Sequence, residues 1–145
     1  MERVAEVAAI ALPFGWLGMV LAISFLEAPL KFRAPGITVP LGLGIGRLVF
    51  HALNTAELVL AALLTVAGLT AGLPAAAWVL LVGLVLLLGV QVLLLRPRLD
   101  RRAEEVVAGL TPPPSRLHLA YIGLEVVKVL ALPILGTMVA VSLLP

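Results

Sequence analysis

Four long apolar segments limit what this chain can fold into. They cover roughly residues 7–28, 45–70, 75–95 and 117–143. Each is long enough to cross the hydrocarbon core of a bilayer, which needs about 20 mostly apolar residues. Hydrophobic residues make up 62% of the chain and charged residues 12%, and a soluble domain of 145 residues could not bury so much apolar surface. The sequence therefore predicts an all-α integral membrane protein with one domain, 1–145, built as a four-transmembrane-helix bundle.

The connections between these segments differ in character. Three prolines and several glycines in 29–44 disfavour a continuous helix, so an interfacial or partly re-entrant segment is expected there. Residues 72–74, Gly-Leu-Pro, predict a tight turn. Residues 96–116 are the one hydrophilic stretch, and their 100–108 part is expected to form a surface helix.

The basic residues predict an orientation in the membrane. Eight of the ten lie in or beside the first and third connections, whereas Arg3 lies at the opposite end and Lys128 lies within a segment. The eight are Lys31, Arg33, Arg47, Arg96, Arg98, Arg101, Arg102 and Arg116. Because cytoplasmic loops are rich in Lys and Arg, we expect both loops in the cytoplasm and both termini outside it, in a multi-pass protein of the cell (inner) membrane. This placement also explains the positive net charge, so no nucleic-acid partner is expected.

Two of the apolar segments carry a column of polar side chains. The first column is Arg47, His51, Asn54 and Glu57, and the second is His118, Tyr121, Glu125 and Lys128. These spacings place the members of each column on one side of an α-helix. A charge inside a bilayer is costly, so such a column usually faces a protein interior or a water-filled cavity and marks a functional site.

The columns predict a polar funnel. At a rise of 1.5 Å per residue, Glu57 and Lys128 both lie about 15 Å from the charged ends of their segments, near the middle of a core roughly 30 Å thick. Glu27, Ser24 and Gln91 add polar groups from the other two segments, while the opposite halves of the segments are mostly apolar. The funnel is expected to open to the cytoplasm and to be closed on the other side. The expected pathway residues are Glu27, Arg47, His51, Asn54, Glu57, Gln91, His118, Tyr121, Glu125 and Lys128.

These side chains could instead serve only to neutralise one another. Lys128 would then pair with Glu57, and Arg47 with Glu125 or Glu27, which would fix the register of the helices. A purely structural bundle could use apolar residues throughout, as the outer half does. Because intramembrane charges are expensive, a functional site is favoured.

Three functions are compatible with these residues. The favoured one is a small transporter or permeation module for a proton-coupled or cationic solute, because its titratable groups are reachable from one side only. No cofactor is expected for this function, and an enzymatic reaction is not favoured. The second is a membrane redox protein, in which His51 and His118 ligate a b-type haem, or bind a divalent metal together with Glu57 and Glu125. The third is an accessory subunit whose buried charges dock a partner helix.

Two further patterns concern assembly. The pairs Gly42/Gly46 and Gly68/Gly72 allow close approach of helices, either within one bundle, which is favoured, or between copies in a homo-oligomer. In addition, the second and fourth segments both open with Arg-Leu, followed by a His and then a Glu. A parallel repeat of two helical hairpins would produce this pattern. The offsets differ by one residue, however, so similar membrane-insertion requirements are the alternative explanation.

Short motifs at the segment ends resemble the transmembrane protein 205 family and its bacterial relatives, which are described as copper-resistance-like four-span proteins. The similar motifs are Ser24-Phe25 through Phe32-Arg33, Arg96-Pro97-Arg98 and Arg116-Leu117-His118. The resemblance implies a four-span membrane protein associated with metal or drug tolerance. It favours transport over catalysis.

Overall fold

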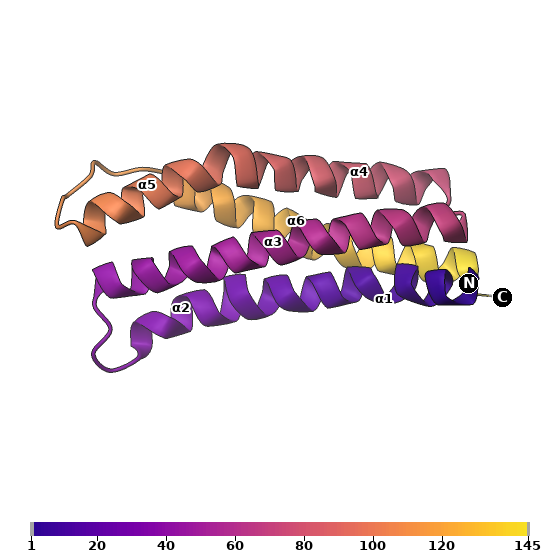
Figure 1. The fold of residues 1–145 in the computed structure, drawn as a ribbon, viewed down its shortest axis with the longest axis horizontal. Coiled ribbons are helices and arrows are strands. Elements are labelled where there is room, and N and C mark those ends of the chain that lie inside the picture. Colours follow the sequence, from indigo (N-terminus) through magenta and orange to yellow (C-terminus); the bar gives the residue numbers. More distant parts are fainter. Residues whose placement is uncertain (1, 145) are drawn as a thin grey trace.

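Four long helical segments lie side by side in the structure, a computed structural model that describes residues 2–144 (Figure 1). The first segment consists of α1 (Glu2–Val20), η1 (Leu21–Glu27), α2 (Ala28–Leu30) and η2 (Lys31–Arg33). The second is α3 (Val39–Ala71), the third consists of α4 (Ala75–Val90), η3 (Gln91–Leu95) and α5 (Arg96–Val107), and the fourth is α6 (Leu117–Leu143). Each segment is long and apolar enough to cross a membrane, as the sequence predicted.

The helices are arranged so that α3 and α6 lie on one diagonal of the bundle. Both α1 and α4 pack against α3 and α6. The two chain ends and the turn at 72–74 lie at one end of the bundle, which we call the terminal end (Figure 1). Residues 34–38 and 108–116, which are not helical, lie at the other, which we call the loop end. Because α3 and α6 both start at the loop end, their polar columns run in the same direction.

The first connection is shorter than the sequence predicted. Helix was expected to be interrupted over 29–44, but only 34–38 are non-helical. Pro40 is tolerated because it lies in the first turn of α3, where its missing N–H is not needed. Thr38 caps this helix, since its hydroxyl accepts a hydrogen bond from the Leu41 backbone N–H at 3.3 Å. The expected interfacial segment is therefore largely helix.

The other two connections follow the sequence more closely. Gly72 has a φ of 73°, a left-handed conformation that ends α3 and confirms the tight turn at 72–74. The expected helix at 100–108 is present as α5. It is not separate, however, because it continues from α4 through η3.

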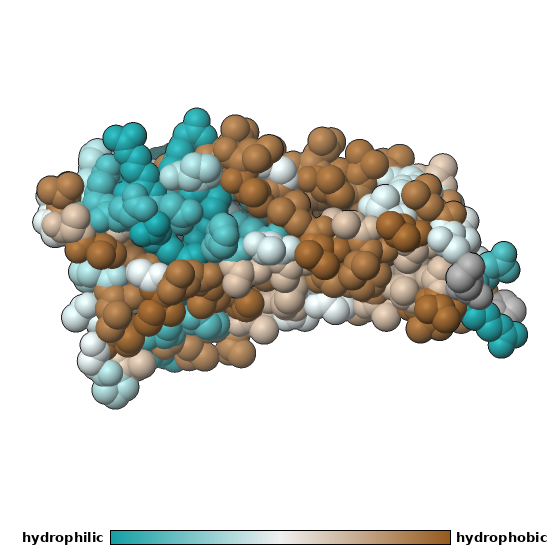
Figure 2. All heavy atoms as spheres, viewed as in Figure 1, coloured by the Kyte–Doolittle hydropathy of each residue, from teal (hydrophilic) through white to brown (hydrophobic). Residues whose placement is uncertain are grey.

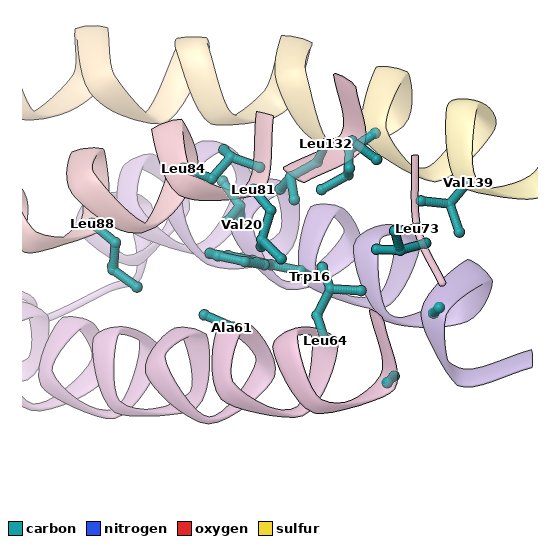
Figure 3. Packing of buried hydrophobic residues seen from close by; sticks show 14 residues of the cluster. Trp16, Val20, Ala61, Leu64, Leu73, Leu81, Leu84, Leu88, Leu132 and Val139 are labelled. Carbon is teal, nitrogen blue, oxygen red and sulfur yellow. The ribbon is translucent and has the colours of Figure 1, made fainter. Parts of the chain in front are cut away.

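Apolar packing fills the terminal half of the bundle. Figure 3 shows Trp16 of α1 surrounded by side chains of the other helices, among them Leu64, Leu81 and Leu132. These four side chains are at most 1% exposed. Hydrophilic side chains instead gather at the loop end, where Figure 2 shows them over α5, while apolar side chains cover most of the remaining visible face. The two ends of the bundle therefore differ sharply in polarity.

Three of the four glycines in the two pairs face side chains of the same chain, whereas a Cβ on Gly72 would meet no atom within 4 Å. A Cβ atom on Gly42 would overlap the ring of Phe32, and one on Gly46 would lie 3.0 Å from Lys31 Nζ. A Cβ on Gly68 would lie 2.7 Å from Leu73 Cδ1. These contacts agree with packing within one bundle. Homo-oligomer formation stays a prediction.

Candidate functional site

Three charged side chains meet in the middle of the bundle. Lys128 Nζ forms ion pairs with Glu57 Oε1 and, at 2.9 Å, with Glu125 Oε1. All three residues are at most 1% exposed, and we call them the buried triad. Glu125 and Lys128 are one turn apart on α6, and Lys128 reaches across the diagonal to Glu57 on α3. The pairing of Lys128 with Glu57 that the columns predicted is present.

Neutral donors from the other two segments hold the carboxylates. Trp16 Nε1 donates to Glu57 Oε1 at 2.8 Å. Glu125 accepts two hydrogen bonds, from Ser24 Oγ at 3.0 Å and from Gln91 Nε2 at 2.8 Å. Hydrogen bonds to an ionised carboxylate are stronger than those between neutral groups. All four helical segments therefore contribute to this site.

The buried triad does not balance its own charge. Two carboxylates share one ammonium, which leaves one formal negative charge when all three groups are ionised. Two buried oxygens at the site, Glu57 Oε2 and Gln91 Oε1, make no hydrogen bond to any residue that the structure describes. An uncompensated buried charge is unfavourable unless a proton or a cation neutralises it. The site is thus suited to accepting a positive charge.

Both donors to Glu125 come from π-helical turns. Ser24 lies in η1, and Gln91 is the first residue of η3. Such turns insert an extra residue into an α-helix and occur frequently at functional sites. Here they lie just before the loop-end part of the first and third segments, at the level of the buried triad.

A second polar pair lies about one turn nearer the loop end. The hydroxyl of Tyr121 donates to Asn54 Oδ1 at 2.9 Å, and both side chains are buried. The Tyr121 ring also meets the ring of Phe50 edge-on, with 5.6 Å between the centroids. The columns of α3 and α6 therefore meet in successive pairs across the bundle.

A cavity of about 420 Å³ extends from the loop end to Glu125. Ser24, Tyr121 and Glu125 line its inner part, and Lys31, Arg47 and Arg96 lie nearer the loops. Most of the remaining wall is apolar or aromatic: Phe25, Ala28, Pro29, Phe32, Gly42, Leu43, Gly46, Phe50, Leu99, Ala103 and Ile122. The cavity lies at the loop end, where the funnel was predicted, and the apolar core lies on its terminal side. Its walls differ from the prediction, because four of the ten expected pathway residues line it: Arg47, His118, Tyr121 and Glu125.

Ion pairs of α3 and α5 lie beside the mouth of this cavity. Arg47 Nη2 contacts Glu104 Oε1 at 2.5 Å, and Arg47 Nε lies 3.8 Å from Asp100 Oδ1. Arg96 Nη2 lies 3.1 Å from Asp100 Oδ1 and also donates to the backbone carbonyl of Arg47 at 3.1 Å. These contacts attach α5 to the first turns of α3.

The partners that the purely structural alternative assigned to Arg47 are not found. That alternative paired Arg47 with Glu125 or Glu27, but Glu125 pairs with Lys128, and Glu27 pairs with Lys31 at 3.4 Å. The physical reason is that α5 continues the third segment alongside α3, so its carboxylates lie closer to Arg47. Glu27 is half-buried and does not line the cavity.

The structure does not bring the two histidines together. The side chain of His51 is exposed on α3 and does not line the cavity, whereas His118, also exposed, lies at the cavity wall. Placing His51 on the inner face was wrong, because at 100° per residue it points about 120° away from the buried face centred on Glu57. Within residues 2–144, no three His, Cys, Asp or Glu side chains are grouped to hold a metal ion. The haem and metal alternatives thus gain no support from the geometry.

Several site residues were not predicted from the sequence. Trp16 and Asp100 were missed, and so was Phe50, which lies between two cations. Lys31 Nζ is 5.7 Å and Arg96 Cζ 5.3 Å from the centroid of the Phe50 ring. The Arg96/Asp100 spacing of four residues was an available signal for a helical ion pair. A tryptophan in an aliphatic segment is a weaker signal, because it usually indicates packing.

Comparison of this chain with protein-family models, curated proteins and solved structures finds no match.

Proposed function

We propose that this protein is a small membrane transporter or permeation module for a proton-coupled or cationic solute. The observation that carries the proposal is a buried triad with one uncompensated negative charge at the inner end of a cavity that opens toward one end of the bundle. Ionisable groups inside a membrane segment are expensive and usually belong to ion or proton pathways. A structural ion pair would need one carboxylate for one ammonium.

The geometry suggests how a positive charge would be accepted. Glu125 is the member of the triad that lines the cavity, so it is the first carboxylate that a proton or cation meets. When Glu125 is neutralised, Lys128 loses one of its two partners and remains paired with Glu57. The ammonium then lies nearer α3, and the change at the cavity is passed to the carboxylate beside Trp16.

Release on the terminal side requires a rearrangement of the apolar core. Pro13 of α1 and Pro133 of α6 both lie inside helices in this half of the bundle. A proline removes a backbone hydrogen bond and is a common site of helix bending. These two positions are the proposed points at which the terminal end opens.

In the proposed orientation the protein lies in the inner membrane of the cell, and its loop end faces the cytoplasm. The distribution of Lys and Arg supports this orientation, because eight of the ten lie in the loop-end half of the chain's segments and connections. The resemblance to the transmembrane protein 205 family is compatible with the proposal but does not carry it.

Flux into liposomes tests the proposal. The purified protein is reconstituted with a pH-sensitive dye inside the vesicles, and an imposed membrane potential drives cation or proton entry. Glu125→Gln keeps the shape of the side chain and removes its charge, so flux is expected to fall at least tenfold. Glu105→Gln is the matched control, because Glu105 pairs with Arg101 within α5 and does not line the cavity. Unchanged flux in the Glu125→Gln protein would overturn the proposal.

A further inference from the structure

The cavity has the size and walls of a binding site for an organic molecule. Its volume of about 420 Å³ lies within the range of pockets that bury small organic ligands, roughly 300–1,000 Å³. Such pockets are mostly apolar and contain a few polar groups that orient the ligand. Aromatic and aliphatic side chains form most of this wall, including Phe25, Leu99 and Ile122.

Charge is distributed unevenly along the cavity. Near the mouth, three cations are matched by three carboxylates: Lys31, Arg47 and Arg96 with Glu27, Asp100 and Glu104. At the inner end, two carboxylates share one ammonium, which gives the buried triad one formal negative charge in excess when all three groups are ionised. A ligand with one positive charge is therefore favoured there, and an anion is disfavoured.

We infer that the cavity binds an organic monocation, a protonated amine or quaternary ammonium with an apolar body. Its charged end lies at Glu125, and its body lies against the apolar wall between the inner end and the mouth. The inference rests on the proposed function and names the solute class. A hard metal ion fits less well, because such ions take six or more oxygen ligands, whereas Ser24 and Glu125 are the oxygen donors of the inner wall apart from the Tyr121 hydroxyl.

The cavity also reaches the apolar surface of the bundle. Phe25 of η1 and Ile122 of α6 both line the cavity, yet they are 39% and 37% exposed. These two elements contact each other. An apolar body can thus pass from the lipid-facing surface into the cavity beside Phe25 and Ile122, without crossing the ion pairs at the mouth.

Three probes of matched shape test this inference by isothermal titration calorimetry on the detergent-purified full chain. Benzyltrimethylammonium has a charge and an apolar body. Neopentylbenzene has the same shape without the charge, and tetramethylammonium has the charge without the ring. We expect saturable binding of benzyltrimethylammonium, and binding at least tenfold weaker for each of the other two.

Two variants locate the binding. Glu125→Gln removes the charge at the inner end, and Ile122→Trp fills the cavity from its exposed rim without altering any charge. Each is expected to weaken benzyltrimethylammonium binding at least tenfold, whereas Glu105→Gln leaves it unchanged. If one of the two variants fails to fold, the other still decides the result.

The outcomes separate the ligand class from the proposed function. Equal affinity for neopentylbenzene would overturn the role of charge, and equal affinity for tetramethylammonium would overturn the role of the apolar body. Absence of benzyltrimethylammonium binding in a protein whose proton flux depends on Glu125 would overturn this inference and leave the proposed function intact. Loss of both would overturn both.

Discussion

Lys128 supplies the positive charge that stabilises both buried carboxylates, Glu57 and Glu125. Glu57 and Glu125 each retain a neutral donor, from Trp16 and from Gln91, but within residues 2–144 the ammonium that contacts them is that of Lys128. Lys128 depends less on either carboxylate, because it keeps one ion pair when the other carboxylate is removed. Substitutions of the three residues should therefore lower the free energy of unfolding by different amounts.

We expect Lys128→Met to be much more destabilising than Glu57→Gln. The first leaves two carboxylates buried without a cation, and removing one partner of a buried pair costs about 3–5 kcal/mol. The second leaves Lys128 paired with Glu125 and keeps an acceptor for Trp16, so the loss should be about 1 kcal/mol. Thermal unfolding in detergent measures both, and similar losses in the two variants would contradict the shared-cation arrangement.

Individual site residues could be predicted where polarity stood out from an apolar background. Asn54, Glu57 and Lys128 were placed in the interior because each is an isolated polar residue inside a long apolar segment. The same argument failed for His51, since spacing alone does not say where the buried face of a helix is centred. Glu104 could not be predicted as the partner of Arg47, because that contact depends on where α5 lies.

The loop-end part of the first segment packs against α3 at two glycines. Phe32 covers Gly42, and Lys31 covers Gly46. The sequence predicted helix breaking over 29–44 because prolines and glycines are frequent there. It could not show that Pro40 occupies a first helical turn or that the glycines serve as contact surfaces.

Gly42→Ala and Gly44→Ala form a matched pair for this contact. Both replace glycine by alanine in the same turn of α3, but a Cβ on Gly42 would overlap Phe32, whereas one on Gly44 meets no atom within 4 Å. We expect Gly42→Ala to lower the free energy of unfolding by about 1–3 kcal/mol through overpacking. Gly44→Ala should be neutral or stabilising by up to about 1 kcal/mol, because alanine is the better helix former. Equal stability of the two variants would show that η2 does not pack against α3 at Gly42.

The proposed function of the whole molecule depends on the difference between the two ends of the bundle. The loop end carries the cavity and most charges, and the terminal end is closed by apolar packing around Trp16 (Figures 2 and 3). The number of helices and their apolar character could be predicted from the four long apolar segments of the sequence. Their order around the bundle did not, because any order with short connections would satisfy the same hydrophobic pattern.

Cysteine labelling tests the proposed orientation, and the chain has no native cysteine to interfere. Glu2 at the terminal end and Ala108 at the loop end are both exposed, which makes them suitable positions. In intact cells, a membrane-impermeant maleimide is expected to modify the Glu2→Cys protein. It should spare the Ala108→Cys protein until the membrane is permeabilised. The opposite pattern would place the cavity on the outer side of the membrane.

The role of the buried triad in transport is tested by measuring stability and flux in one variant that lacks all three charges. Glu57→Gln, Glu125→Gln and Lys128→Met together remove all three charges while keeping the side-chain volumes similar. Replacing a buried ion pair by well-packed hydrophobic residues of similar volume is often neutral or stabilising by about 1–4 kcal/mol. The two glutamines also keep acceptors for Trp16 and Ser24, so this protein should unfold close to the temperature of the original. Its cation or proton flux in liposomes should nevertheless fall to that of protein-free vesicles. A stable triple variant that retains flux would show that the buried triad only fixes the packing of the helices.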